Sequence, residues 1–554
     1  MNNYNIAKEL LEIETLLELN DKTTVAKDFE HSALSILVLD RPVLKMQSLN
    51  FLPEAVRDEI ISICEFGYSP LKESLEAKTP KVLKQLLSLP GIRTRDILRI
   101  YNLLKIDSAT ELEKLLREGV IRKTFGEKFE EHLRRALIHY GSSKKELGLF
   151  YAYGYANTVK MALESLGDIE VAGSVRRGKE VVNNIDFVYD FEEEKLLKEV
   201  TSTFSISSFT RRGNLITCKD TDNIQLKFFK VPKAYFFSGL QYYTGSKQHN
   251  KIILEIAKAK GFEIAKEGFA LIKADSENEF YERLSLEYIP PEIREGEEEI
   301  DLAISFSIPK LVSLSDMKGD LHMHTTFSDG SSSVFEMYEE ANLLGYEYIA
   351  ITDHSKSLRI ANGLSRNSLL KEIEIIDRIN ADGLEPVILK GIEAEIGPHG
   401  EVDIDEDMRP RLDLVIGGLH QFSSTNFENT ERVKKAIKSG IINIVAHPTN
   451  RIIFLRKSIE VDIGTIFEEA YKNDVALEVN LFPNRMDLNT GLIKEARRAK
   501  VKFFSVGTDA HNRGHLHFMK YGIKILRRAW VRSEEILNSY SLETLKELLW
   551  TKTH

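Results

Sequence analysis

Residues 319–330 read GDLHMHTTFSDG and hold three side chains of the kind that binds transition metals: His322, His324 and Asp329. More histidines and acidic residues recur toward the C-terminus, each at or just after the end of a short apolar run. They are His354, Glu393, His420, His447, Asp509 and His511. Imidazole and carboxylate donors without cysteine suit Zn²⁺, Mn²⁺ or Fe²⁺. A set this large predicts two or three divalent ions and metal-assisted hydrolysis of a phosphate ester.

From residue 316 onward, apolar runs alternate with segments of helical periodicity. The runs are YIAIT (348–352), VILKGIE (387–393), LDLVIGG (412–418), INIVAH (442–447), VALEVN (475–480) and KFFSVG (502–507). This alternation predicts βα units and a parallel sheet, either open or closed into a barrel. The loops at the carboxyl ends of barrel strands converge on one face, so we expect the candidate ligands to meet there. Histidines used only for packing would instead be scattered along helix faces and strand interiors.

The first 300 residues show a different sequence pattern. Residues 1–150 show helical periodicity throughout, whereas IEVAG, NIDFVYD, LITCKD and NIQLKFFKV between residues 151 and 235 are typical of strands. The segment YIPPEIREGEEEID (288–301) predicts a surface linker with a solvated acidic run. We therefore expect a helical domain over 1–150, a second domain over 151–300, a linker over 301–315 and the barrel over 316–554.

Composition limits the class of protein. The 554 residues are 42% hydrophobic and 29% charged, which is typical of a globular protein. A polar N-terminus, the lack of a long apolar run and only two cysteines predict a cytoplasmic protein with no membrane contact. A dedicated duplex-binding module carries a basic excess, because phosphate contacts dominate its affinity. The net charge of −10 therefore predicts weak DNA binding, confined to local patches.

The motif series DLHMHT–SDG, TDH, GIE, GLH, AHP and TDAH resembles that of the polymerase-and-histidinol-phosphatase (PHP) family. The resemblance implies a distorted (β/α)7 barrel with up to three metal ions. It places His322, His324, Glu393 and Asp509 in one part of the cluster, with Glu393 bridging two ions. It assigns His420 and His447 to a second ion, and Asp329, His354 and His511 to a third.

The preceding residues resemble a family X DNA polymerase of the kind fused to a PHP domain. AGSVRRGKE (172–180) is similar to that family's nucleotide-binding turn, and YYTGSKQHN (242–250) to its aromatic–TGS segment. The resemblance implies a helix-hairpin-helix-like DNA-binding domain, then a nucleotidyltransferase-like palm and a thumb. It also implies a nucleotide pocket; the alternative is that the same residues are inherited scaffold. The pocket residues are Ser174, Arg177, Tyr243, Gly245 and Asn250, the last at the family's minor-groove position.

The polymerase-like half departs from the family pattern at its catalytic carboxylates. Two-metal nucleotidyl transfer needs carboxylates that hold Mg²⁺ against the triphosphate and the primer hydroxyl. Asn184 takes the place of the first carboxylate and Lys227 that of the third, which leaves Asp186. We therefore expect this half to be degenerate. Lys227 either lies beside Asp186 and neutralises it or points to solvent.

The DNA-binding turns depart from the pattern as well. Helix-hairpin-helix turns contact phosphates through backbone N–H groups of a glycine-rich loop. LPEAVRDEI (52–60) has no glycine, LPGIRTRDI (89–97) has Arg93 at the second glycine position, and TFGEKFEEHL (124–133) keeps Gly126. Specific binding to gapped DNA is therefore expected to be reduced.

These observations predict a metal-dependent phosphoesterase, a 3′-5′ exonuclease or 3′-end processing nuclease that acts as a monomer on single-stranded or gapped DNA in repair. Arg485 would orient a substrate phosphate, or else pair with Asp487. His515 and His517 are expected on a surface helix rather than as further ligands. The alternatives are an active gap-filling polymerase, a small-molecule phosphatase of the histidinol-phosphate type, and a non-catalytic sensor.

Overall fold

The computed structural model describes residues 1–46, 49, 51–87, 92, 94–140 and 146–550. The chain divides into two compact units. Met1–Lys145 with Ile452–Lys457 form the first, and Glu146–Arg451 with Ser458–His554 form the second. Within the described residues, no helix has both the length and the apolar character that a membrane span requires.

The first unit is helical, as the periodicity predicts. Its helices are α1 (Asn3–Leu19), α2 (Thr23–Leu37), α3 (Glu54–Phe66), α4 (Pro70–Lys78), α5 (Lys81–Leu87), α6 (Thr94–Leu104), α7 (Ala109–Arg117), α8 (Val120–Phe125) and α9 (Glu127–Tyr140). Helix α1 begins where the Asn2 side chain accepts a hydrogen bond from the Asn5 N–H, and it buries Ile6, Leu10, Ile13 and Leu17 along one face. Of the candidate DNA-binding turns, LPEAVRDEI leads into α3 and Gly126 lies between α8 and α9. Of the segment LPGIRTRDI, residues 89–91 and 93, which include both candidate glycine positions, fall outside the described residues.

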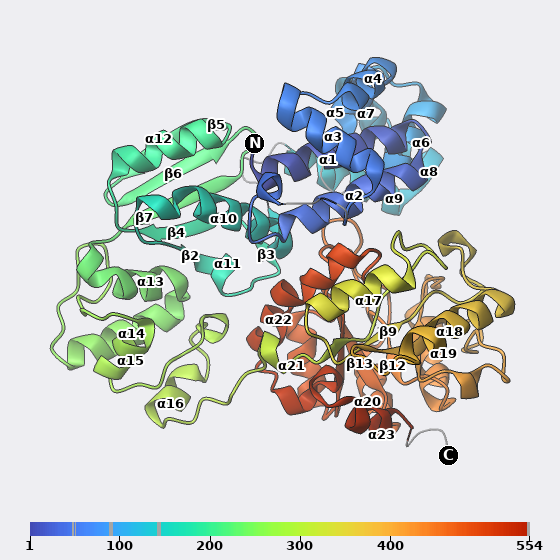
Figure 1. Ribbon diagram of the computed structural model, residues 1–554. Helices are drawn as coiled ribbons and strands as arrows, with labels where there is room; N and C mark the ends of the chain where they lie inside the picture. The colour runs from blue at the N-terminus through green and yellow to red at the C-terminus, as the bar shows by residue number, and fades with distance from the viewer. Residues whose placement is uncertain (47–48, 50, 88–91, 93, 141–145, 551–554) are drawn as a thin grey trace. The chain divides into compact units, whose positions relative to one another are not determined.

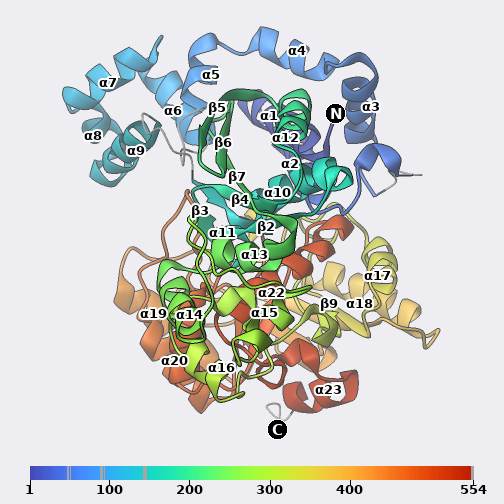
Figure 2. The same ribbon diagram turned by 90° about the vertical axis from the view of Figure 1, so that its left-hand side faces the viewer.

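The second unit begins with a mixed five-stranded sheet in the order β2-β4-β7-β6-β5. Its strands are β2 (Ile169–Ala172), β4 (Ile185–Tyr189), β5 (Ile206–Arg212), β6 (Leu215–Asp220) and β7 (Gln225–Lys230), and α10 (Leu149–Leu163) and α12 (Glu193–Thr203) lie beside it (Figures 1 and 2). The four predicted strands are confirmed. The sequence did not predict β5, because it is exposed along nearly its whole length and lacks apolar alternation. Strands β4 and β7 run parallel, which sets Asp186 opposite Lys227.

Helices α13 (Phe236–Thr244), α14 (Lys247–Ala259), α15 (Glu277–Arg283) and α16 (Glu299–Ile304) follow the sheet. They enclose a core that includes Ile253, Phe280 and Ile293. The prediction of a solvated acidic run in this region is wrong for two of its glutamates. Glu299 is fully buried and accepts a hydrogen bond from His249 Nδ1 at 2.8 Å, while Glu295 pairs with arginines. Each carboxylate faces its own cationic or N–H partner, which a run of like charges does not reveal.

The C-terminal part is a seven-stranded parallel barrel, so the predicted (β/α)7 fold is confirmed. Its strands are β8 (Gly319–Asp320), β9 (Tyr348–Ile351), β10 (Val387–Glu395), β11 (Leu414–Gly418), β12 (Ile444–Val445), β13 (Ala476–Asn480) and β14 (Phe504–Gly507), in sequence order across the sheet. A parallel bridge between Met323 and Ala510 joins the first strand to the last. Helices lie around the strands (Figure 1): α17 (Val334–Leu343), α18 (Arg366–Asn380), α19 (Asn426–Lys438), α20 (Ile463–Lys472), α21 (Thr490–Arg498), α22 (Met519–Arg528) and α23 (Leu542–Trp550).

The barrel interior explains why the polar side chains gather at one end. Strands β9 to β14 are buried along nearly their whole length, and apolar residues such as Leu321, Leu389 and Ile416 fill the interior. The histidines and acidic residues come at or after the carboxyl end of each strand. Because all seven strands are parallel, these ends meet on the same face.

Candidate metal centre

The structure brings all nine candidate ligands together at the carboxyl end of the barrel. Each reaches at least one other member of the set through a nitrogen–oxygen distance below 4 Å. The nine side chains come from the ends of six of the seven barrel strands. Strand β13 is the one that contributes none of them.

Glu393 lies at the centre of the cluster. Its Oε1 is 2.9 Å from His447 Nε2 and 3.2 Å from His420 Nε2. Its Oε2 is 3.0 Å from His354 Nδ1 and 3.4 Å from His322 Nε2. The two oxygens of one carboxylate thus face two different groups of imidazoles, which is the arrangement that a bridging ligand needs.

A second group forms around Asp509. The His324 Nε2 lies 3.1 Å from Asp509 Oδ1 and 3.1 Å from His322 Nε2. All three side chains are buried. Two ring nitrogens and a carboxylate oxygen therefore converge on one small volume, as the predicted first subsite requires.

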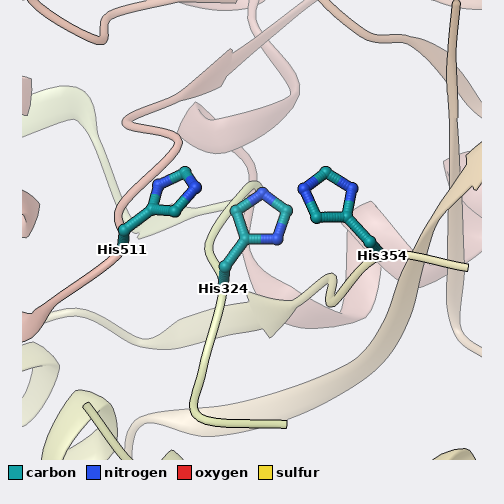
Figure 3. Close-up of side chains that lie close together, drawn as sticks. All are labelled: His324, His354 and His511. Carbon is teal, nitrogen blue, oxygen red and sulfur yellow. The ribbon is translucent and has the colours of Figure 1, made fainter. Parts of the chain in front are cut away.

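The third group contains Asp329, His354 and His511. Asp329 Oδ1 is 3.6 Å from His354 Nε2 and 3.5 Å from His511 Nε2. Figure 3 shows His324 between the rings of His354 and His511, with ring centroids 4.3 Å and 4.6 Å away. The groups therefore share members, and His354 contacts both Glu393 and Asp329.

The carboxylates and imidazoles of the cluster shift one another's pKa values. Burial alone would raise the pKa of Glu393, but the surrounding histidines hold it well below its ordinary value. Burial would lower the pKa of His420 and His511, yet Glu393 raises the first and Asp329 the second to about 9. His324 differs: burial and the neighbouring imidazoles lower its pKa to about 4.

The donor set fits divalent cations. Three combinations place one ligand atom from each of three residues within 4.8 Å of one another: His322–His324–Asp509, His354–Glu393–His420 and His324–His354–His511. Within the described residues, the buried Nδ1 atoms of His324 and His447 have no hydrogen-bond partner. Nitrogen and carboxylate donors without sulfur suit Zn²⁺, Mn²⁺ or Fe²⁺. The role of each residue as a ligand stays a prediction.

Two glutamates that the sequence analysis did not single out hold the candidate ligands in place. Glu478 Oε1 accepts a hydrogen bond from His322 Nδ1 at 2.6 Å, and Glu395 Oε2 accepts one from His420 Nδ1 at 2.7 Å. A carboxylate behind a ligating histidine fixes its ring and its tautomer. The sequence carried one signal: a glutamate in the buried apolar run VALEVN is out of place unless it serves a polar site.

The expectation that His515 lies on a surface helix is wrong. His515 is fully buried, its Nδ1 accepts a hydrogen bond from the His511 backbone N–H at 3.2 Å, and its ring stacks on Phe518. It supports the loop that carries His511. His517 is partly exposed and pairs with Glu340 at 2.9 Å, so it lies outside the cluster.

Arg485 lies at the edge of the cluster. Its Nε is 3.4 Å from Asp509 Oδ2, and its side chain is 20% exposed. The Asp487 carboxylate, the alternative partner, accepts hydrogen bonds from the Thr449 N–H and hydroxyl instead. A partly exposed guanidinium beside the candidate metal ligands is available to a phosphate, and this role stays a prediction.

The five-stranded sheet β2-β4-β7-β6-β5, which corresponds to the expected palm, holds a much smaller polar group. Lys227 Nζ donates to Asn184 Oδ1 at 3.1 Å, and Asn184 Nδ2 donates to Asp186 Oδ1 at 2.6 Å. Lys227 therefore points into the site rather than to solvent, and it reaches Asp186 through Asn184. Burial raises the pKa of Asp186 to about 6, although Lys227 and Asn184 act in the opposite direction. Gly173 packs directly on this carboxylate, because a Cβ there would collide with it.

Several residues of the expected nucleotide pocket are engaged in internal contacts. Arg177 is buried; its Nε lies 2.9 Å from Glu295 Oε1, and it donates to the Thr244 carbonyl at 2.6 Å. Asn250 Nδ2 donates to the Tyr242 carbonyl at 2.6 Å and to that of Gly245 at 3.3 Å. These contacts favour the alternative that this pocket is inherited scaffold.

The two other pocket residues lie nearby in the same unit. Tyr243 stacks on Phe229 at 4.0 Å, and its hydroxyl accepts a hydrogen bond from Asn214 at 2.8 Å. Ser174 belongs to the short helix α11 (Gly173–Arg176), which follows β2. Nucleotide binding by these residues stays a prediction.

Comparisons with known proteins agree with both resemblances. The DNA polymerase beta thumb family matches residues 239–295, and the PHP domain family matches residues 320–480. The chain is 31% identical over 229 residues to "Probable phosphatase YcdX" of Shigella dysenteriae, an alignment of 40% of this chain and 89% of that protein. It is 33% identical over 570 residues to "DNA polymerase/3'-5' exonuclease PolX" of Bacillus subtilis, across 99% of each chain. The chain therefore belongs to the PolX family, the family X DNA polymerases and exonucleases that carry a PHP domain.

Proposed function

We propose that the protein is a metal-dependent phosphoesterase that hydrolyses DNA from its 3′ end through the barrel. The observation that carries the proposal is the convergence of six imidazoles and three carboxylates on the barrel rim, with Glu393 between two groups of histidines. The relative from Bacillus subtilis, whose name includes a 3′-5′ exonuclease, aligns with the whole chain and supports DNA as the substrate.

The residues fall into three roles. One ion would be held by His322, His324 and Asp509, and a second by His420 and His447. Glu393 would contribute to both of these subsites. A third ion would be held by Asp329, His354 and His511. The ions, when bound, would activate water and stabilise the charge on the phosphate. Arg485 would hold a non-bridging phosphate oxygen through its guanidinium. Glu395 and Glu478 keep the ring nitrogens of two ligands correctly protonated.

A cavity of about 330 Å³ adjoins this site. Its wall includes Glu395, Asp403, Gln421 and Arg432. Glu395 also accepts the hydrogen bond from His420, so the cavity lies directly behind one of the candidate ligands. None of the nine candidate ligands lines this cavity, and Glu401 and Asp405 add to the acidity of its wall, so it gives no support for binding a phosphate ester there.

We further propose that the palm does not polymerise nucleotides. Asp186 is the one carboxylate left at the family's catalytic positions, and Lys227 places an ammonium group where a metal ion would need a ligand. An ammonium group has no lone pair with which to bind a cation. The palm would then serve to guide a DNA end to the barrel.

The experiment is to incubate Mn²⁺-loaded protein with 5′-labelled single-stranded and gapped DNA and with a phosphomonoester. The proposal expects stepwise shortening from the 3′ end, and loss of that activity in the variant His322→Ala, His324→Ala. Cleavage of the phosphomonoester without cleavage of DNA would select a small-molecule phosphatase, which the match to YcdX favours.

A gap-filling polymerase is the second candidate, because the relative's name includes that activity. Primer extension with Mg²⁺ and with Mn²⁺ tests it. Robust nucleotide incorporation by the unmodified protein would overturn the proposal for the palm.

A further inference from the structure

Strand β13 is the barrel strand that supplies none of the candidate ligands, yet two of its side chains contact the cluster. Glu478 and Asn480 are two positions apart, so both point to the same face of the strand. Both are buried, with at most 1% of their surface exposed. Asn480 Nδ2 donates to Asp509 Oδ2 at 3.1 Å. A strand without ligands therefore supports ligands that its neighbours supply.

Glu478 contacts two separate parts of the cluster at once. Its Oε1 accepts a hydrogen bond from His322 Nδ1, and its Oε2 accepts one from the His447 backbone N–H, each at 2.6 Å. His322 belongs to the group around Asp509, and His447 to the pair that faces Glu393 Oε1. One carboxylate thus connects the two predicted subsites.

The backbone around Glu478 is shaped to accommodate it. His447 has a φ of 25°, which a residue with a side chain rarely adopts, and its N–H is the group that Glu478 holds. On the neighbouring strand β14, a Cβ at Gly507 would come within 2.5 Å of both Glu478 Oε1 and His322 Cβ. A glycine at this position leaves the space in which the pair forms.

We propose that Glu478 is a positioning residue that builds the two subsites as one unit. By accepting the Nδ1–H of His322, it leaves the Nε2 lone pair of that ring facing the cluster. By holding the His447 N–H, it fixes a strained backbone in the conformation that aims His447 Nε2 at Glu393. This inference rests on the proposed function only in requiring that the cluster binds metal.

The test measures Mn²⁺ affinity by titrating metal-free protein with Mn²⁺ alone. Glu478→Gln keeps the size of the side chain but replaces one acceptor oxygen by an NH₂ group, which faces a donor. We expect Mn²⁺ to bind roughly 10–100-fold more weakly. Glu469→Gln is the matched control, because Glu469 is also buried but lies on α20 and pairs with Lys438. We expect its affinity to stay within about twofold of the unmodified protein, since it contacts no candidate ligand.

A second measurement does not depend on the folding of a variant. Selective ¹⁵N-histidine labelling of the unmodified protein reports the tautomer of His322, whose signal is assigned by its loss in His322→Asn. The proposal expects a proton on Nδ1 and none on Nε2 in the Mn²⁺-free protein at high pH, and the same tautomer with diamagnetic Zn²⁺ bound.

The proposal is supported if Glu478→Gln binds Mn²⁺ more weakly while Glu469→Gln does not, and if His322 carries its proton on Nδ1. An unchanged affinity, or a proton on Nε2, overturns it, and the tautomer decides if Glu478→Gln does not fold. A purely structural role would lower the thermal stability of the metal-free variant and leave its affinity unchanged. If the unmodified protein takes up no metal, the proposed function fails and this inference fails with it.

Discussion

The barrel rim and the palm both place carboxylates beside nitrogen cations, yet the two sites can do different chemistry. At the rim, Glu393 and Asp509 face imidazoles, which can release a proton and become metal ligands. In the palm, Asp186 is linked through Asn184 to Lys227, whose ammonium group carries no lone pair. From this comparison we expect the chemical type of the neighbouring nitrogen group to decide whether a carboxylate site can accept a metal.

Removing two rim ligands should have the largest effect. In His322→Ala, His324→Ala, the group around Asp509 loses both ring nitrogens, so we expect DNA hydrolysis to fall by at least about 10³-fold. The measurement is the initial rate on 5′-labelled single-stranded DNA. His517→Ala is the control, because His517 pairs with Glu340 outside the cluster. Hydrolysis retained in the double variant would assign the activity to another site.

Restoring the missing carboxylates in the palm should let that site bind a divalent ion, as we propose for the barrel rim. In Asn184→Asp, Lys227→Asp, two carboxylates join Asp186 and the ammonium group is gone, so we expect Mg²⁺ affinity to rise by about tenfold or more. Isothermal titration of this variant and of the unmodified protein, both with the rim already loaded with metal, measures the gain. Equal Mg²⁺ binding at the palm of the two proteins would contradict the proposed effect of Lys227.

Arg485 should affect the rate without affecting metal content. Arg485→Ala removes a guanidinium 3.4 Å from Asp509 Oδ2, and we expect a rate about 10–100-fold lower with unchanged metal per protein. Arg485→Lys should recover only part of the loss, since an amine cannot bind a phosphate in the bidentate manner. A matching loss of metal would show instead that Arg485 supports the ligand Asp509.

The palm should also show the smallest effect, a change in how stability depends on pH. Asp186 has a pKa of about 6, above its ordinary value of 3.8, so its ionisation destabilises the folded protein as pH rises between these values. Lys227 acts to lower that pKa, so Lys227→Met should raise it further. The difference between the free energies of unfolding of the two proteins should therefore change with pH. Relative to its value near pH 4, the free energy of unfolding of Lys227→Met should be lower by about a further 1 kcal/mol above pH 6.

Thermal unfolding across this pH range makes the measurement. The barrel variant Lys371→Met, which removes an exposed lysine of α18, serves as a control for the loss of a lysine outside the palm. A constant difference between Lys227→Met and the unmodified protein at every pH would show that Lys227 does not interact with Asp186.

Much of the fold, and the candidate residues of both sites, could be predicted from the periodicity and motifs of the sequence. Because the carboxyl ends of parallel strands meet on one face, the alternation of apolar runs and helical segments predicted a parallel sheet with the nine candidate residues gathered at one end. The (β/α)7 barrel itself was implied by the resemblance to PHP proteins. The resemblance to PHP proteins and to family X polymerases is confirmed by the match to PolX and by the thumb and PHP families. The proximity of Asp186 and Lys227 was expected from the resemblance to family X polymerases, whose catalytic carboxylates lie on neighbouring strands, and the register of β4 and β7 sets the two residues opposite each other.

The residues that the sequence did not reveal act through three-dimensional contacts. Glu478 meets His322 across 156 positions of the chain, and no local pattern marks such a pair. His515 was expected on a surface helix, yet its ring is fully buried and accepts a hydrogen bond from the His511 backbone N–H. Arg177 matched a nucleotide-binding motif, but its guanidinium is occupied by Glu295, a partner more than a hundred residues away.

The most direct test of the account is elemental analysis of purified protein after exhaustive dialysis, for the unmodified chain, for His322→Ala, His324→Ala and for Asp186→Asn. We predict two to three equivalents of a transition metal in the unmodified protein, a clear loss in the rim variant and no change in Asp186→Asn. A metal content that is unaffected by the rim variant, or that falls in Asp186→Asn, would contradict the assignment of the metal centre to the barrel.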